Sequence, residues 1–291
     1  MLLLLTACQK TASNKPQIVT TFEPMYEFTK AVLGDKVDII NIVPSNQEAH
    51  DFEPSAKDMT TLTNADAIIY NSKNLEKWAP SVKNKGVKIE ASTPVEKIGD
   101  DPHTWVSPKS ALLEVNYIAE ELSKKFPEYK EDFTKNAKEY MAKLKKIDQD
   151  FDQLKSAKNK TFITQHEAFG YLGRDYGLTT IAITGLDPEA EPSSSTLIKL
   201  KEEMQKANLN TVYFEDNSSS KLAETLAKEA GAKLLVINPV EGLTDEQKKA
   251  GESYLTIMEE NLVSLKETIR FWVGGGLWFW VFFKKLVICG N

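Results

Sequence analysis

Three histidines are the residues of this chain best suited to bind a metal ion, and they are its only histidines: His50, His103 and His166. Neutral imidazoles are good ligands for a borderline cation such as zinc, and a fourth donor would complete a tetrahedral site. The two cysteines, Cys8 and Cys289, lie at the extremes of the chain, which excludes a cysteine-based metal site and a disulfide framework. The histidines therefore predict a zinc site, provided that the fold brings them together.

The fourth ligand is expected to be an acidic residue that ends a strand, as the histidines do. Glu241 is preferred, because it follows an apolar run and precedes Gly242, which suits a carboxylate held on a tight loop. Asp216 and Asp187 are the alternatives.

Several neighbours of the histidines are candidates for a supporting role. Acidic residues beside metal ligands often orient the imidazole rings, and aromatic residues shield a site from water. The candidates for ring orientation are Asp51, Asp101 and Glu167, and Trp105 is the candidate for shielding.

Short β-branched runs alternate along the chain with segments of helical period, which is typical of an α/β fold. They predict two α/β lobes of four strands each, with ligands bound beyond the carboxyl ends of the strands. The predicted strands are 17–20, 37–43, 67–70, 87–90, 161–164, 179–184, 211–215 and 233–238. The predicted helices of the lobes are 22–33, 55–63, 108–125, 167–175, 196–207, 220–230 and 245–268.

A longer helix is predicted between the lobes, over residues 128–157, where neither proline nor glycine interrupts one continuous apolar stripe. At ~1.5 Å per residue it would extend about 45 Å, more than the width of one small lobe. It is expected to join the lobes as a rigid strut, so that lobe closure is small. A coiled-coil dimer helix is the alternative to this monomeric arrangement. The stripe consists of Tyr129, Phe133, Ala137, Tyr140, Leu144, Ile147, Phe151 and Leu154.

The two ends of the chain differ from its middle. Residues 5–8, Leu-Thr-Ala-Cys, have the small-residue pattern that precedes a lipidated cysteine, so Cys8 is predicted to anchor the protein to the outer face of a membrane. Residues 271–291 form an atypical aromatic tail that is left out of the fold prediction. The predicted order is a truncated lipoprotein signal at 1–8, a tether at 9–16, a first lobe at 17–126, a linking helix at 127–158, a second lobe at 159–270 and the tail.

The overall charge restricts the partners of the protein. With 36 basic and 42 acidic side chains the net charge is -6, and 41% of the residues are hydrophobic. This balance is that of a folded globular protein and argues against nucleic-acid binding, which needs a basic surface.

Four segments resemble the metal-ligand motifs of zinc-binding lipoproteins that serve bacterial ABC importers: residues 50–54, 101–105, 166–171 and 185–193. Over about residues 16–270 the chain resembles the amino-terminal module of the AdcA and ZnuA type. The resemblance implies two α/β lobes joined by a long helix, with zinc in the interlobe cleft bound by His50, His103, His166 and Glu241. It also implies an extracytoplasmic receptor, not an enzyme, that captures Zn²⁺ with high affinity and delivers it to an ABC permease.

Three other functions compete with this one. A manganese receptor would be expected to replace the third histidine by a carboxylate, whereas His166 favours zinc. A zinc hydrolase would need an open fourth position at the metal. A surface adhesin would use the metal only for stability. The chain also departs from many zinc receptors, because residues 90–101 contain no histidine-rich loop.

Overall fold

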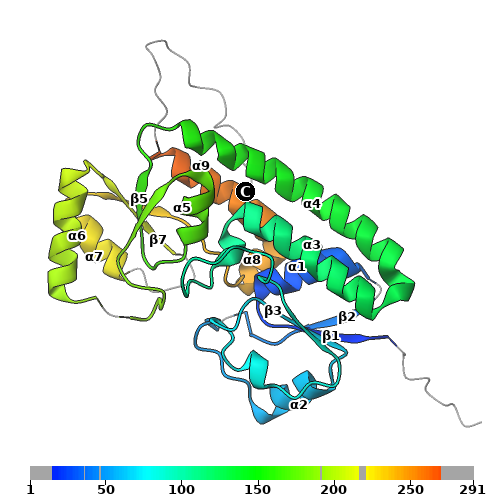
Figure 1. The fold of residues 1–291 in the computed structure, drawn as a ribbon. Coiled ribbons are helices and arrows are strands. Elements are labelled where there is room, and N and C mark those ends of the chain that lie inside the picture. Colours follow the sequence, from blue (N-terminus) through cyan, green and yellow to red (C-terminus); the bar gives the residue numbers. More distant parts are fainter. Residues whose placement is uncertain (1–14, 36, 46, 191, 216–220, 270–291) are drawn as a thin grey trace, which may run out of the picture.

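Alternating strands and helices build two halves, which are flanked along one side by a long helix (Figure 1). The computed structural model describes residues 15–35, 37–45, 47–190, 192–215 and 221–269. The predicted lipidation site Cys8 and the aromatic tail lie outside the described residues. Within the described part of the chain, no helix combines the length and the apolar character that a membrane span requires.

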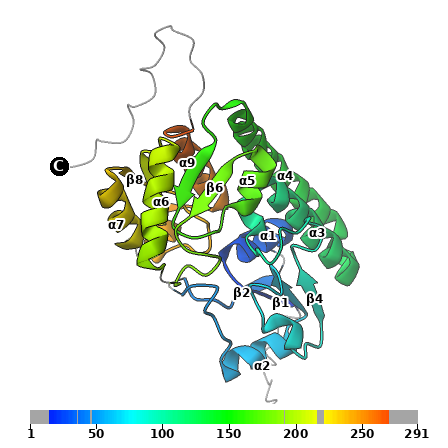
Figure 2. The ribbon, with the colours of Figure 1, turned by 60° about the vertical axis from the view of Figure 1, so that its left-hand side comes forward.

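The first half is one parallel sheet in the order β2-β1-β3-β4. Its core strands are apolar on both faces, as expected for a parallel sheet covered on both sides. Helices α1 (Glu23–Leu33) and α3 (Pro108–Lys125) lie on one side, and α2 (Ala56–Asn64) lies on the other (Figures 1 and 2). The strands are β1 (Gln17–Thr20), β2 (Asp38–Asn41), β3 (Ala67–Tyr70) and β4 (Val87–Glu90).

The second half has the four strands that were predicted for it, but among the described residues they do not form one hydrogen-bonded sheet. Its hydrogen-bonded strands form two parallel pairs, β5 with β6 and β7 with β8, although β5 lies next to β7. The strands are β5 (Thr161–Thr164), β6 (Thr179–Ala182), β7 (Thr211–Phe214) and β8 (Lys233–Val236). The helices around them are α5 (Gly170–Tyr176), α6 (Ser194–Lys206) and α7 (Lys221–Ala230).

The long helix α4 (Lys130–Asp152) packs against α1 and α3 of the first half and against α9 (Tyr254–Lys266) of the second (Figure 1). Short 3₁₀ turns flank it, so the α-helix itself is shorter than the predicted 128–157. Phe133, Leu144 and Phe151 of its apolar stripe are fully buried within the chain. The stripe is thus covered by the protein's own helices, which removes the basis for a coiled-coil dimer.

The predicted helix 245–268 is wrong, because the structure has two helices there. Helix α8 (Asp245–Ala250) ends at Gly251, whose φ of 82° is in the left-handed region. Helix α9 then begins after Ser253, whose side chain caps the backbone N–H of Thr256. A cap and a left-handed glycine close together therefore divide a segment whose apolar spacing alone suggested one helix.

Buried aromatic residues connect the two halves. Phe28 of α1 packs edge-on against Tyr254 of α9, with ring centroids 4.9 Å apart. Tyr254 also donates a hydrogen bond to the backbone carbonyl of Trp105, and the indole N–H of Trp105 donates to that of Pro239. These buried contacts join segments 134 or more residues apart, which makes the interface between the halves part of the core.

Candidate metal centre

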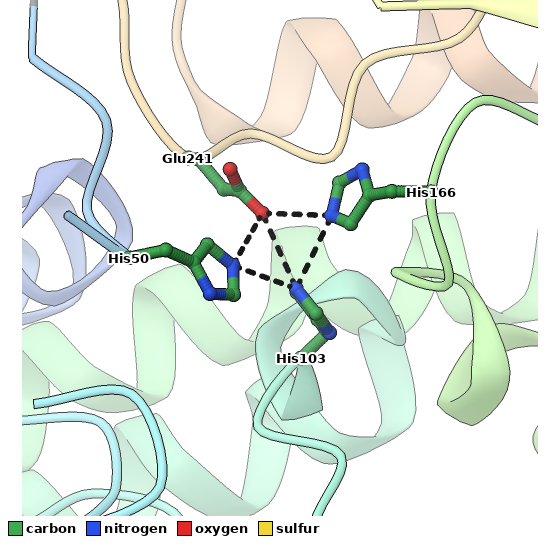
Figure 3. A group of neighbouring side chains, drawn as sticks. All are labelled: His50, His103, His166 and Glu241. Atoms are coloured by element: carbon green, nitrogen blue, oxygen red, sulfur yellow. Dashed lines mark hydrogen bonds and ion pairs between the residues drawn. The ribbon is translucent and has the colours of Figure 1, made fainter. Parts of the chain in front are cut away.

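Each of four candidate ligands is placed by a loop that follows a strand. His50 follows β2, His103 follows β4, His166 follows β5 and Glu241 follows β8. Because all strands of these sheets are parallel to their partners, their carboxyl ends face the same region between the halves. Figure 3 shows the four side chains pointing toward one another from these separate loops.

Five of the six distances between the four donor atoms are close to the edges of a small tetrahedron. Nε2 of His103 lies 3.1 Å from Nε2 of His50 and 3.3 Å from Nε2 of His166 (Figure 3). Oε1 of Glu241 lies 3.5 Å from Nε2 of His50 and 3.4 Å from each of the other two. Zinc bonds of ~2.0–2.1 Å in a tetrahedron place neighbouring donors about 3.3–3.4 Å apart. The measured spacings therefore fit a tetrahedral zinc ion at the centre.

Two carboxylates hold the buried imidazoles from behind. Oδ1 of Asp101 lies 2.8 Å from Nδ1 of His103, and Oε1 of Glu215 lies 2.7 Å from Nδ1 of His166. A carboxylate in this position accepts a hydrogen bond from Nδ1–H and so leaves the lone pair on Nε2. Both rings therefore present their metal-binding nitrogens to the centre of the cluster.

The side chains differ in exposure to water. His103 and His166 are fully buried and Glu241 is 6% exposed, whereas His50 is 14% exposed. His50 is thus the donor nearest to solvent. Trp105, fully buried, packs beside His103 with ring centroids 5.3 Å apart and covers the site from within.

The charges of the site depend strongly on one another. Burial by itself lowers the pKa of His166, but hydrogen bonds to Glu215 and Glu241 outweigh it and raise that pKa to about 11. Burial also lowers the pKa of His103, but the hydrogen bonds to Asp101 and Glu241 outweigh it, so that this pKa is raised. Burial raises the pKa of Glu241, yet the surrounding imidazoles hold it well below its usual value. The metal-free site therefore retains a proton among these groups at neutral pH, and a bound cation must displace it.

Some predicted supporting residues do not reach the site. Asp51 and Glu167 are exposed, and in the described part of the chain neither forms a hydrogen bond or ion pair with a histidine of the cluster. The prediction that they orient the rings is wrong for this reason. Of the alternative fourth ligands, Asp187 is exposed and caps a turn at the backbone N–H of Glu189, and Asp216 lies outside the described residues.

Two carboxyl groups of the site were missed in the sequence. Glu215 lies directly after β7, so its position at a strand end was the available signal, but its neighbour Asp216 was considered instead. Glu48 lies two residues before His50, and only this proximity could have indicated it. Burial, followed by the nearby carboxylate of Glu241, raises the pKa of Glu48 to about 10.

The fold and the cluster together define an α/β metal-binding protein with three imidazoles and a carboxylate between its halves. The chain belongs to the family described as zinc-uptake complex component A periplasmic (ZnuA), whose model matches residues 18–268. This confirms the resemblance seen in the sequence.

Individual relatives support the same assignment. The zinc-binding lipoprotein AdcA of Streptococcus pneumoniae is 43% identical over 91% of this chain, and the high-affinity zinc uptake system protein ZnuA of Bacillus subtilis is 40% identical over 92%. The match covers 58% of AdcA and 94% of the Bacillus protein, so this chain spans little more than half the length of its streptococcal relatives. The crystal structure of the Zn(II)-bound ZnuA-like domain of that AdcA is similar with a TM-score of 0.80 at 44% identity, covering 88% of this chain and 99% of the domain.

Proposed function

We propose that this protein is an extracytoplasmic zinc receptor, which binds one Zn²⁺ through His50, His103, His166 and Glu241 and delivers it to an ABC permease. The single observation that carries the proposal is the tetrahedral spacing of the four donors, 3.1–3.5 Å along the five measured edges. The zinc-related names of its relatives and the Zn(II)-bound state of a similar structure support it.

The donor set favours zinc over manganese. Three imidazoles and one carboxylate in a tetrahedron suit zinc, whereas manganese prefers oxygen ligands in octahedral geometry. His166 supplies a nitrogen where a manganese site would need another oxygen.

Binding and release, rather than catalysis, is the chemistry that this arrangement supports. A catalytic zinc ion keeps one position open for water, but here Glu241 occupies the fourth corner. The protein is therefore proposed to act without chemical turnover: the ion enters beside His50, is held by the buried donors and leaves when the cleft loosens at the permease.

Membrane attachment and organisation complete the proposal. Acylated Cys8 would hold the protein at the outer face of the membrane through the tether 9–16, and the protein would act as a monomer. The first lobe (17–126) and the second lobe (159–270) would close slightly on the ion around the rigid linking helix (127–158).

A metal-content experiment tests the zinc site. The protein is stripped of metal, loaded with zinc and freed of excess ion, and the zinc bound per chain is measured. The wild type and Asp187→Ala, which changes an exposed carboxylate, are expected to retain one ion, and the combined His50→Ala, His103→Ala and His166→Ala variant is expected to retain none. Equal zinc in the triple variant and the wild type overturns the proposal.

A further inference from the structure

Asp101 makes more contacts than its role behind His103 requires. Its Oδ1 accepts hydrogen bonds from both the backbone N–H of His103, at 2.9 Å, and Nδ1 of the same ring, at 2.8 Å. The direction of the His103 ring therefore depends on where the backbone and carboxylate of Asp101 lie.

The second half of the chain fixes that position through Tyr171 of α5. The Tyr171 hydroxyl donates to the backbone carbonyl of Asp101, at 3.1 Å, and accepts from the backbone N–H of Ile98, also at 3.1 Å. Tyr171 is fully buried, so water does not compete for these bonds. One hydroxyl thus bridges both ends of the four-residue segment that leads to His103.

Arg174, one turn further along α5, supports the same contact. Its guanidinium lies 4.9 Å from the centre of the Tyr171 ring, and its Nη1 donates to the backbone carbonyl of Glu96 at 2.7 Å. The guanidinium therefore contacts both the Tyr171 ring and the backbone at the start of the 96–101 segment.

Gly170 makes the close approach possible. A Cβ atom at this position would lie 2.5 Å from Oδ2 of Asp101, well inside contact distance. Only glycine leaves room for the carboxylate, so the Asp101 side chain packs directly against the backbone of α5.

We propose that Gly170 and Tyr171 are positioning residues, which set the direction of the His103 imidazole by fixing Asp101. Since α5 begins four residues after His166, the helix that would position His103 follows directly on a ligand from the other half of the protein. This inference rests on the proposed zinc site and deepens it: the direction of Nε2 of His103 depends on α5.

Tyr176 provides a matched control within the same helix. It is also fully buried, and its hydroxyl also donates a hydrogen bond, at 2.8 Å, but to Asp148 of α4, away from the metal centre. Tyr176→Phe therefore removes a buried hydroxyl of the same kind without touching Asp101.

The experiment compares Tyr171→Phe, Gly170→Ala and Tyr176→Phe with the wild type as full chains. Zinc release into an excess of a chromophoric chelator gives the dissociation rate. In the zinc-loaded proteins, ¹⁵N NMR of the histidine rings reports through the Nδ1–H signal of His103 whether its hydrogen bond to Asp101 remains, a readout that lost packing alone does not move. Loss of a partner behind a ligand typically costs 10–100-fold in metal affinity, so we expect about tenfold faster release for Tyr171→Phe and at least that for Gly170→Ala.

Tyr176→Phe is expected to release zinc at the wild-type rate and to keep the wild-type Nδ1–H signal of His103. If Tyr171→Phe matches Tyr176→Phe in both the release rate and the NMR signature, the positioning role is overturned while the zinc site stands. Should Tyr171→Phe not fold, the same comparison with Gly170→Ala decides. A wild type that binds no zinc overturns the proposed function, and this inference with it.

Discussion

Glu215 Oε1 lies 2.7 Å from Nδ1 of His166, and both side chains are buried. The same oxygen lies 3.2 Å from the backbone N–H of His166, so the carboxylate fixes the ring and its backbone together. A metal ligand oriented in this way loses little conformational freedom when the ion binds.

Replacing Glu215 by glutamine is expected to weaken zinc binding about 10–100-fold, because the neutral amide holds Nδ1–H less strongly and makes the imidazole a poorer donor. The matched control is Glu167→Gln, which removes the same charge from the exposed residue next to His166. Competition titration with a chelator of known affinity measures both. Equal affinities for the two variants would show that Glu215 does not support the ligand.

Replacing Glu241 by alanine separates a receptor from a hydrolase. A receptor that uses the carboxylate as its fourth ligand should lose more than the ~10–100-fold expected for a supporting residue. A hydrolase with an open fourth position would keep its zinc, and retention of wild-type affinity by Glu241→Ala would therefore contradict the closed site. Asp187→Ala serves as the control for removal of a negative charge.

Zinc affinity should fall as the pH is lowered. In the metal-free site the pKa of His166 is raised to about 11, so already at pH 7.5 the ion displaces a proton from the cluster. Each displaced proton lowers affinity about tenfold per pH unit, and the raised pKa of His103 means that protonation of this ring adds to the slope. Titrations between pH 7.5 and 5 measure this, and an affinity that stays flat across the range excludes the three-histidine site.

Removing zinc should leave the protein folded, because the interface between its halves is made of buried aromatic contacts rather than of metal bonds. Adding zinc at about 100 times its dissociation constant should then stabilise the fold by ~2.7 kcal/mol. For domains of this size that corresponds to a rise in Tm of roughly 5–10 °C, measurable by calorimetry. A chain that unfolds on metal removal would instead fit an adhesin with a structural metal.

Glu114 of α3 predicts a pH dependence of stability that is independent of zinc. The carboxyl is fully buried, and burial raises its pKa from 4.5 to about 8. Between pH 4.5 and about 8 the folded state keeps the proton on Glu114, whereas the unfolded state loses it. This group therefore makes the folded state less stable as the pH rises from about 4.5 to 8. Glu114→Gln removes the titration and should raise Tm by a few °C at pH 8, but change it little at pH 5. Thermal unfolding at both pH values is the measurement, and an equal effect at both would contradict the assignment.

The sequence predicted the parts of the site that follow from strand ends. The three histidines and Glu241 each follow a strand, and parallel pairing brings such positions to one edge of each sheet, whereas the meeting of these edges depends on the interface between the halves. Glu215 also follows a strand, but its position alone did not show that it contacts His166, because that residue lies 49 residues away and the contact depends on how β5 and β7 come to lie side by side.

Contacts between residues close in the sequence were likewise easier to predict than contacts between distant ones. Asp101 was recognisable beside His103 because the contact spans two residues, whereas Tyr171 reaches Asp101 across 70. Apolar spacing located most helices, but it missed the break at Gly251, where the backbone conformation rather than the hydrophobic pattern ends α8.

The greater exposure of His50 sets the order in which the ligands can exchange. Water or an incoming donor can attack the ion only where the protein leaves it accessible, and the other two imidazoles are fully buried. In the proposed receptor, release would begin with the loop that carries His50, while the other three donors would still hold the ion. An acceptor that supplies its own ligand at that moment can take the ion by stepwise transfer, without zinc passing free through the solvent.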